Sequence, residues 1–435
     1  MEPINLSEKI TTDILRPVGI TKSFKIWMTA LLVAFGICIY AYTLQLRNGL
    51  GVTGLRDYIS WGMYIANFVF FVASSLIGML ISAVLGLSGA KWITPIARIA
   101  EIIALAFASV AGLVIISDMG RPERLPNVFI YGRIQSPILW DVTVVTTYVV
   151  ISALLLYLPL IPDLAICSRR MDTPPWLRKI YRLMSLGWSG TPEQTAMIQK
   201  CTRILLILIV PVALAIHTVT SWLFAATPRA GWNSSVFGPY FVSGAFVAGA
   251  AAVIIAMYFF RRNYKLHDYI TDSHFDKMGK LLVLVSLVYL YFNINEFLVP
   301  GYKLEKAEAK YLHEIFAGRY AVLFWSAQLL GVIIPIILLL IKSVRKPLPM
   351  MIIAAFVLAA SWIKRLLIVV PTQEHPFLPI QYVPQNFKFY TPTLTETLIT
   401  LASIILVLII VTILSKFFPV IPIEETINEL KHGDK

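Results

Sequence analysis

Ten long apolar stretches run through this chain, and no other feature of the sequence constrains its fold as strongly. A helix that crosses the hydrocarbon core of a bilayer needs about 20 apolar residues. The stretches that meet this length are 24–45, 61–87, 96–118, 137–161, 204–225, 240–260, 280–298, 320–341, 350–370 and 394–417. We therefore predict an all-α, multi-pass integral membrane protein with about ten transmembrane helices.

The composition agrees with a chain that lies mostly in lipid. Of its 435 residues, 58% are hydrophobic and only 14% are charged, which is outside the range of soluble domains. The net charge of +13 would suggest a nucleic-acid partner for a soluble protein. Here the basic residues gather in short loops between the apolar stretches, where membrane topology explains them, so nucleic acid is excluded as a partner.

The distribution of basic residues predicts the orientation in the membrane. Of the 37 Lys and Arg residues, 24 lie in the N-terminal segment, the even-numbered loops and the C-terminal end, whereas the odd-numbered loops hold 11. Cytoplasmic loops carry the excess of positive charge in membrane proteins. Both termini are therefore predicted to be cytoplasmic, and the odd-numbered loops to face outward.

A weak internal repeat suggests two similar halves. Trp61-Gly62-Met63-Tyr64 begins the second predicted helix, and Phe237-Gly238-Pro239-Tyr240 begins the sixth. Repeats of this kind are common in membrane proteins. We predict two four-helix bundles, 61–225 and 237–370. The segment 1–60 supplies a cytoplasmic N-terminus, one peripheral helix and an outer loop, and 371–435 supplies an outer loop, a second peripheral helix and a cytoplasmic tail.

Polar groups gather in the outer third of the predicted membrane region. Ionisable side chains inside apolar helices are costly and usually serve a function. The residues that share this depth are Asn67, Asp118, Asp141, His217, Asn293, Asn295 and Glu296. His217 also follows Pro211, which frees backbone groups, and precedes Ser221 by one turn.

Each of these residues also has a structural interpretation. Asp141, in the first turn of its helix, would complement the helix dipole, and Asp118 would pair with Arg121 or Arg124. His217 would be a core histidine bonded to a neighbouring hydroxyl. Glu296 would be a structural or interface residue. Lys364 and Arg365 would snorkel outward or pair with Glu296. Glu101 would pair with Arg98 rather than serve as a step in proton passage.

The sequence argues against metal-based redox centres in this chain. Cys38, Cys167 and Cys201 are too few and too scattered for an iron-sulfur cluster. His217 is the only histidine inside a predicted helix, whereas membrane haems commonly take paired histidines at matched depth. We therefore expect no metal, haem or iron-sulfur cluster, and electrons must come from another subunit.

Several motifs resemble one known family. They are WGMYIANFVFF (61–71), SDMGRPER (117–124), SPILWDV (136–142), LIPDLA (160–165), LGWSGTPEQ (186–194) and HTVTSWLFA (217–225). In this order, across 24–417, they resemble the NrfD/PsrC family of quinone-interacting membrane subunits. Its ten-helix branch, with DsrP/HmeB-type, quinone reductase complex and alternative complex III subunits, is the most similar.

The resemblance implies a subunit of a respiratory oxidoreductase complex in the cytoplasmic membrane of a prokaryote, in some relatives within sulfur metabolism. It implies quinone, menaquinone favoured, as substrate near the outer face of the first bundle. A ferredoxin-like multi-cluster iron-sulfur subunit would dock on that face, with a multihaem cytochrome and other membrane subunits as further partners. The family positions are Asp118, Asp141 and His217. This chain departs from the alternative complex III relatives at two positions. Those relatives often carry an acid where this chain has Leu223, and often His where it has Asp118.

These observations give a mechanistic hypothesis. Reduction of a quinone takes two electrons and two protons, so a site needs a hydrogen-bonding group and proton exchangers. His217, beside Ser221, would bond a quinone carbonyl, Asp141 and Asp118 would exchange protons, and Asn67 or Tyr64 would orient the ring. Outside the proposed quinone site, Glu101 would belong to a possible path for proton translocation. Arg121, Arg124 and Arg229 would lie at the interface with the partner subunit.

Two other classes of protein stay open. A secondary transporter or ion channel also has repeats and buried polar groups, but would place unwound Gly- and Pro-rich segments at the midplane of both halves. A structural membrane anchor for redox subunits would have no quinone chemistry of its own. A bound quinone on the purified protein would separate these classes.

Overall fold

The computed structural model describes residues 6–85, 87, 91–169, 174–376 and 382–427, and every regular element in these ranges is a helix. Ten helical spans are long and apolar enough to cross a membrane, which confirms the predicted fold class. They are α2 (Lys22–Asn48), α3 (Met63–Leu80, continued to Ala83), α4 (Thr94–Asp118), α6 (Pro137–Tyr157), α9 (Pro192–Ala225), α10 (Phe237–Asn263), α11 (Asp272–Lys303), the span Ala321–Leu340, α15 (Pro347–Glu374) and α16 (Leu394–Phe417).

The helices begin where the sequence supplies a cap or a proline. The Thr21 hydroxyl accepts a hydrogen bond from the Phe24 amide at 3.2 Å at the start of α2. Thr393 and Glu396 form a reciprocal capping box at the start of α16. Proline occupies the first turn of α6, α9 and α15, where its missing N–H costs nothing.

Several predicted boundaries are wrong because helices continue beyond the apolar core. α9 begins at Pro192 rather than near 204, and α11 covers Asp272–Lys303 rather than 280–298. The stretch 299–319, between two predicted membrane helices, contains the end of α11 and α12 (Lys306–Phe316). The eighth span is not uniform, because a π-helix at Leu329–Ile333 separates α13 (Ala321–Gln328) from α14 (Ile334–Leu340).

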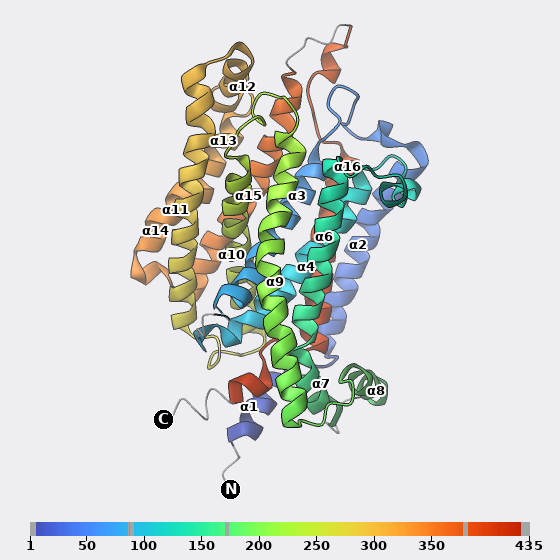
Figure 1. The fold of residues 1–435 in the computed structure, drawn as a ribbon, viewed down its shortest axis with the longest axis vertical. Coiled ribbons are helices and arrows are strands. Elements are labelled where there is room, and N and C mark those ends of the chain that lie inside the picture. The colour runs from blue at the N-terminus through green and yellow to red at the C-terminus, as the bar shows by residue number, and fades with distance from the viewer. Residues whose placement is uncertain (1–5, 86, 88–90, 170–173, 377–381, 428–435) are drawn as a thin grey trace.

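Helices α3 and α10 form the centre of the molecule (Figure 1). α3 packs on α4, α9, α10, α15 and α16, and α10 packs on α3, α9, α11 and α15. In Figure 1, α11 to α14 lie on one side of this centre, and α2, α6 and α16 on the other. α2 and α16 pack along each other, and α16 also packs on α4.

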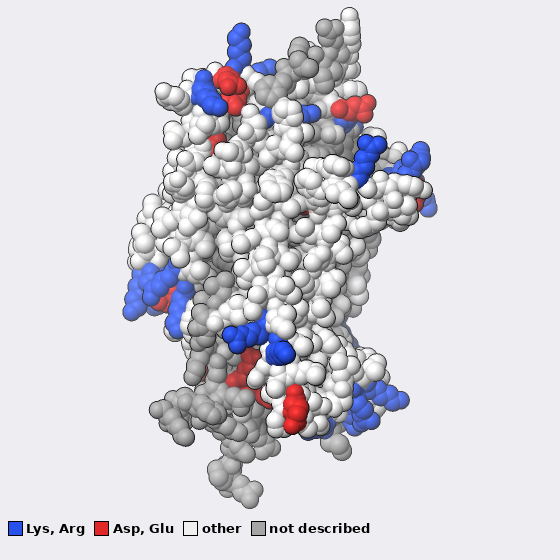
Figure 2. All heavy atoms as spheres, viewed as in Figure 1, with Lys and Arg blue, Asp and Glu red and all other residues white. Residues whose placement is uncertain are grey.

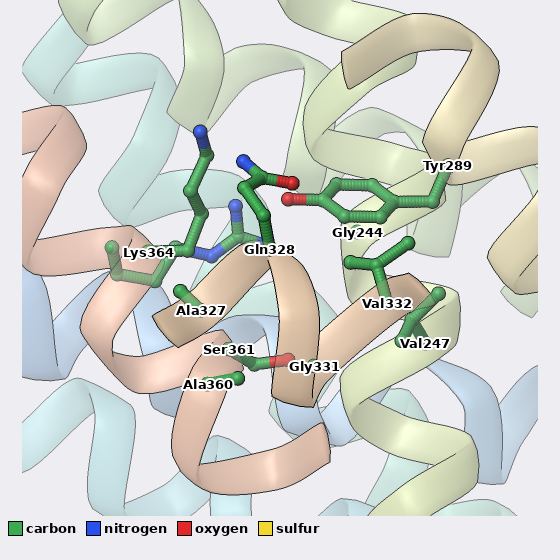
Figure 3. Close-up of a pocket in the computed structure, with 11 residues that line it drawn as sticks. Gly244, Val247, Tyr289, Ala327, Gln328, Gly331, Val332, Ala360, Ser361 and Lys364 are labelled. Carbon is green, nitrogen blue, oxygen red and sulfur yellow. The ribbon is translucent and has the colours of Figure 1, made fainter. Parts of the chain in front are cut away.

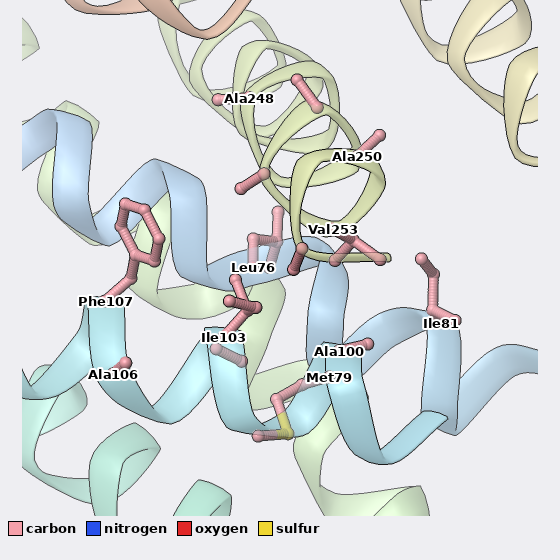
Figure 4. Packing of buried hydrophobic residues seen from close by; sticks show 14 of the residues in the cluster. Leu76, Met79, Ile81, Ala100, Ile103, Ala106, Phe107, Ala248, Ala250 and Val253 are labelled. Atoms are coloured by element: carbon pink, nitrogen blue, oxygen red, sulfur yellow. The ribbon is translucent and has the colours of Figure 1, made fainter. Parts of the chain in front are cut away.

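Small residues allow the central helices to approach closely. A Cβ atom added at Gly78 of α3 would lie 2.1 Å from the Ala100 carbonyl oxygen of α4. Figure 4 shows Leu76 and Met79 of α3 near Ile103 of α4 and Val253 of α10, within the cluster of buried apolar side chains. Such close packing supplies dispersion contacts that compensate for the weak hydrophobic drive between helices in lipid.

Charged side chains gather toward the two ends of the molecule. On the face shown in Figure 2, a belt of uncharged side chains crosses the middle, with Lys, Arg, Asp and Glu above and below it. α1 (Leu6–Leu15) and the segment after α16 lie at the same end of the bundle (Figure 1). The arrangement fits a chain that crosses the bilayer an even number of times.

A buried ion pair closes the predicted inner end. The guanidinium of Arg98 on α4 pairs with the carboxylate of Asp163 on α7 (Leu160–Arg169), and each side chain is 1% exposed. Arg98 also donates to the Pro159 carbonyl, and the Ile423 amide donates to Asp163 at 3.3 Å. The pair therefore ties α4, α7 and the C-terminal segment together. Arg98 pairs with Asp163 rather than with Glu101, the partner considered from the sequence.

Replacing Arg98 with Met should destabilise the folded protein by about 3–5 kcal/mol, because it leaves the Asp163 carboxylate buried without its cation. Thermal unfolding of the purified protein measures this effect. Lys280→Met is the matched control, since Lys280 pairs with Asp276 at 2.7 Å but is 64% exposed. Its cost should stay below about 1 kcal/mol. Equal losses of stability in the two variants would show that the Arg98–Asp163 pair does not hold α4, α7 and the C-terminal segment together.

Candidate functional site

A chain of hydrogen bonds joins α2, α3 and α4 at the ends that are predicted to face outward, called the outer ends below. The Tyr64 hydroxyl on α3 donates to Gln45 Oε1 on α2 at 2.6 Å, and Gln45 Nε2 donates to the Ser117 carbonyl on α4 at 2.7 Å. Tyr64 and Gln45 are both buried. Because the Tyr64 proton is used in this bond, only the lone pairs of its oxygen remain free for a ligand.

Glu396 at the start of α16 holds the outer loops in place. Its carboxylate accepts hydrogen bonds from the Tyr390 hydroxyl at 2.6 Å, the Gly54 amide at 2.8 Å and the Thr393 amide at 2.9 Å. Burial and the neighbouring carboxylate raise the pKa of Tyr390, which keeps the phenol a neutral donor. We did not single out Glu396 from the sequence, although Thr393 three residues before it is the signature of a capping box.

Asn67 bonds two other helices. Its amide nitrogen donates to the Thr400 hydroxyl of α16 at 2.7 Å, and its oxygen accepts from the Trp362 indole of α15 at 2.7 Å. Asn67 therefore connects α3 to both helices. One N–H and one oxygen lone pair of the amide remain for the predicted role in orienting a ring.

Asp118, the last residue of α4, has an unpaired oxygen. Its Oδ1 is buried without a hydrogen-bond partner, and the carboxylate forms no ion pair within the described residues. Arg121 and Arg124 are exposed instead, so the interpretation of Asp118 as their ion-pair partner is wrong. Tyr64 and Glu396 lie within electrostatic reach of the carboxylate. Asp118 is therefore available to a ligand at the outer end of the first bundle.

Asp141 lies between α6 and α9. Its side chain is 1% exposed and accepts a hydrogen bond from the Thr220 hydroxyl at 2.6 Å. The first turn of α6 holds no acidic residue, so Asp141 lies beyond that turn and is not placed as a helix-dipole partner. No pattern in the sequence pointed to Thr220, because a hydroxyl in an apolar helix usually bonds its own backbone.

His217 of α9 is 2% exposed and has one unpaired ring nitrogen. Its Nδ1 lies 3.1 Å from the Ala213 carbonyl of the same helix. Because a carbonyl only accepts, Nδ1 carries the proton, and Nε2 of the neutral ring is a free acceptor. Ser221, expected beside His217, donates its proton to the Thr218 carbonyl at 2.6 Å. The histidine is thus not satisfied by a neighbouring hydroxyl.

The predicted site residues occupy two levels. Asp118 ends α4 and Tyr64 is the second residue of α3, so both lie at the outer end. His217 lies eight residues before the end of α9, roughly 12 Å deeper along the helix axis. Asp141 and its partner Thr220 lie between these levels. The structure brings Tyr64 close to Asp118, but no direct contact joins either residue to His217.

Glu101, assigned to a possible proton path, is buried near the inner end of α4. Ser82 and Glu425 lie close to its carboxylate. Glu425 also lines a cavity of about 510 Å³, together with Trp188, Gln199 and Arg203. Burial, with Asp163 close by, raises the pKa of Glu424, another residue of this cavity. Neither this cavity nor the smaller one in the second bundle is lined by Asp118, Asp141 or His217.

The residues assigned to the partner interface differ in exposure. Arg121 and Arg124 lie exposed in the loop between α4 and α6. Arg229, in the loop between α9 and α10, is only partly exposed, and its guanidinium lies over the Trp232 ring at 5.8 Å. Its Nη1 is buried without a hydrogen bond. Arg121 and Arg124 are therefore better placed than Arg229 to contact another protein.

The second bundle contains a further buried polar cluster. Glu296 lies inside α11 rather than at its end, and its Oε2 has no hydrogen-bond partner. Asn293 connects α10, α11 and α13, because it accepts from Tyr240 at 3.1 Å and donates to Gln328 at 2.8 Å. Lys364 and Arg365 are 5% and 2% exposed, so neither snorkels outward. Neither forms an ion pair with Glu296 in the described part of the chain.

Two ionisable groups of the predicted first bundle have an unpaired buried atom. Asp118 offers a carboxylate oxygen and His217 offers an imidazole nitrogen, and neither atom has a hydrogen-bond partner among the described residues. No group of three or more His, Cys, Asp and Glu side chains among the described residues could hold a metal ion. The ten candidate membrane spans define an integral membrane protein.

Comparison with known proteins identifies the family. Residues 51–376 match the family model described as polysulphide reductase, NrfD. The chain therefore belongs to the NrfD family, which confirms the resemblance seen in its motifs. It is a multi-pass membrane subunit of prokaryotic respiratory oxidoreductase complexes.

Three curated relatives illustrate this family. A putative dimethyl sulfoxide reductase membrane subunit of Halobacterium salinarum is 30% identical over 73% of this chain and 69% of its own length. A selenate reductase subunit of Mesobacillus selenatarsenatis is 26% identical over 94% and 97%. The Hdr-like menaquinol oxidoreductase integral membrane subunit of Archaeoglobus fulgidus is 26% identical over 90% and 92%.

Replacing Thr220 with Val should destabilise the protein by about 1–3 kcal/mol, because Asp141 would lose its hydrogen-bond donor in a buried position. Thr218→Val is the control, since Thr218 lies on the more exposed side of the same helix and bonds only the Leu214 carbonyl. Thermal unfolding of both variants measures the difference. A Thr220 variant as stable as the Thr218 variant would mean that Asp141 finds another partner.

Proposed function

We propose that this chain is the quinone-reactive subunit of its complex and that it oxidises or reduces a quinone, menaquinone first, near the outer face of the first bundle. One observation carries the proposal: two buried hydrogen-bond acceptors, Asp118 Oδ1 and His217 Nε2, lack partners in the part of the chain that the structure describes. A buried unpaired acceptor costs free energy, which a ligand with two hydroxyl groups would offset. The name of the Archaeoglobus relative, a menaquinol oxidoreductase subunit, supports the same chemistry.

The two acceptors lie on different helices. Asp118 ends α4, His217 lies about two turns inside α9, and α3 and α6 each pack on both of these helices. A quinol bound among these helices would donate one hydroxyl group toward each acceptor, directly or through a water molecule. Because His217 is 2% exposed, binding requires side chains around it to move aside.

The two acceptors would take the two protons of the quinol. Oxidation of one quinol releases two protons and two electrons and leaves a quinone. His217 in its neutral form accepts one proton at Nε2, and Asp118 in its ionised form accepts the other. Asp118, at the end of α4, would pass its proton to the outer side. In the reverse direction the same groups donate protons to the quinone.

Tyr64 and Asp141 would support the ring. Tyr64 can still accept a hydrogen bond, and Asn67 keeps one N–H and one oxygen lone pair for the same orienting role. Asp141 lies between the two levels and holds its position through Thr220. Ser221, whose proton is used in a backbone bond, can act only as an acceptor.

Electrons would leave through a partner subunit on the outer face. We propose a ferredoxin-like multi-cluster iron-sulfur protein there, with Arg121 and Arg124 meeting its acidic surface, and a multihaem cytochrome further along. Glu101 remains the predicted step toward the inner side. The cavity of about 510 Å³ lined by Glu425 would give it access to water.

Replacing Asp118 with Asn, or His217 with Ala, should lower quinone-linked turnover at least about a hundredfold, because each change removes a proton acceptor. The assay uses the assembled complex in lipid with a soluble quinol. Asp57→Asn is the control, since Asp57 is exposed in the preceding outer loop. Wild-type turnover in both site variants would favour a structural anchor without quinone chemistry.

Replacing Arg121 and Arg124 together with Gln should weaken attachment of the iron-sulfur subunit without changing the fold, because both side chains are exposed. We expect less iron to copurify with the variant, and the loss to grow with salt concentration. Lys342→Gln, on the opposite end of the molecule, is the control. Unchanged iron content at every salt concentration would exclude this face as the docking surface.

A further inference from the structure

Two consecutive cations lie buried in the middle of α15. Lys364 is 5% exposed and Arg365 is 2% exposed. A charged side chain at this position in a membrane protein is costly and needs a partner. Arg365 cannot escape this cost by losing its proton, because a guanidinium stays charged in proteins.

No carboxylate within the described residues pairs with either cation. The ammonium of Lys364 lies over three aromatic rings, at 4.4 Å from the centre of Phe297, 5.1 Å from Phe324 and 5.7 Å from Tyr240. Cation–π contacts of this kind partly replace hydration. Glu296 is the nearest acid, close enough to act on Lys364 electrostatically but without an ion pair. The charge of Lys364 is therefore accounted for by aromatic rings and one distant acid.

The buried charge of Arg365 is compensated less well than the charge of Lys364. Its guanidinium lies 5.1 Å from the centre of the Phe241 ring. Its Nε is buried without a hydrogen bond, and the side chain makes no hydrogen bond to any described residue. The phenols of Tyr289 and Tyr240 favour its charge electrostatically, whereas the neighbouring Lys364 opposes it. A permanently charged group with five donors is thus left without an acceptor.

The guanidinium borders a small cavity. The space open to the centre of a water molecule is about 20 Å³, which suits one particle of that size or a little more. Figure 3 shows the amide of Gln328 and the ring of Tyr289 at one end of this pocket, with Ser361 and Gly331 at the other. The lining therefore offers hydroxyl and amide donors beside two cations.

The helices around the cavity are shaped to leave this space. The π-helix Leu329–Ile333 contributes Gly331 and Val332 to the lining. A Cβ atom added at Gly244 of α10 would lie 2.9 Å from Arg365 Nη2 and would displace the guanidinium from its present position. π-helices of one turn are frequent at functional sites. The site thus combines a backbone irregularity with a glycine that admits the cation.

We infer that this cavity binds a small monovalent inorganic anion of about the size of chloride, held by Arg365 with Lys364 and the hydroxyl group of Ser361. Two cations and one carboxylate, Glu296, leave one positive charge in excess, which a single anion neutralises. A water molecule would accept hydrogen bonds from the guanidinium but would not offset its charge. The size of the cavity excludes phosphate and sulfate. The inference does not depend on the quinone site.

Bromide serves as the probe of this site. The purified complex in lipid nanodiscs is kept in sodium gluconate, whose anion is too large for the cavity, and sodium bromide or chloride replaces it at constant ionic strength. An anion that binds only the folded protein raises the unfolding midpoint in a saturable way, on the order of 3 °C at high occupancy. Lys280→Met, an exposed site, should keep this rise. Arg365→Met should lose it.

Anomalous diffraction from crystals soaked in bromide gives a second measurement that does not depend on a variant. We expect a peak beside the Arg365 guanidinium and none there in gluconate. If Arg365→Met fails to fold, Gly244→Ala tests the same site, because the added methyl group pushes the guanidinium aside. A midpoint that does not depend on the anion, or a bromide-soaked crystal without this peak, would show that water alone fills the cavity and overturn the inference.

Discussion

Every polar side chain that enters the membrane with these ten helices must find its partner inside the protein, because lipid offers none. Most of them do. Asn67 bonds Thr400 and Trp362, and Arg98 pairs with Asp163. These bonds also connect helices that lie far apart in the chain, so satisfying them fixes the arrangement of the helices. Several buried polar atoms of the described residues have no partner, and the proposed ligands are assigned to those of Asp118, His217 and Arg365.

The number of spans followed directly from the sequence, since 20 apolar residues in a row have few other uses. Helix ends were less predictable, because polar turns at 192–203 and 272–279 extend the helices past the membrane. Partner choice was not predictable at all. Nothing in the sequence near Arg98 points to Asp163, which is 65 residues away, and nothing near Asp141 points to Thr220, 79 residues away.

The candidate site shows the same division. Its residue types could be predicted because ionisable groups stand out in apolar helices. Their hydrogen-bonding states could not be predicted. For His217, the free ring nitrogen is the one that does not bond the Ala213 carbonyl, and only the structure shows which one that is. The unpaired oxygen of Asp118 depends on where Arg121 and Arg124 point. The division of these residues into two levels came from the structure.

The hydrogen bonds of Glu396 have a consequence for biosynthesis. A ribosome delivers α2 and α3 to the membrane long before α16, yet Gly54 in the loop between them bonds Glu396, and Asn67 bonds Thr400. Until translation is nearly complete, these groups lack their final acceptors and donors. The first half of the chain therefore cannot mature as an independent unit, and a nascent chain that stops before residue 394 leaves an incomplete outer surface for the cell's membrane proteases to recognise.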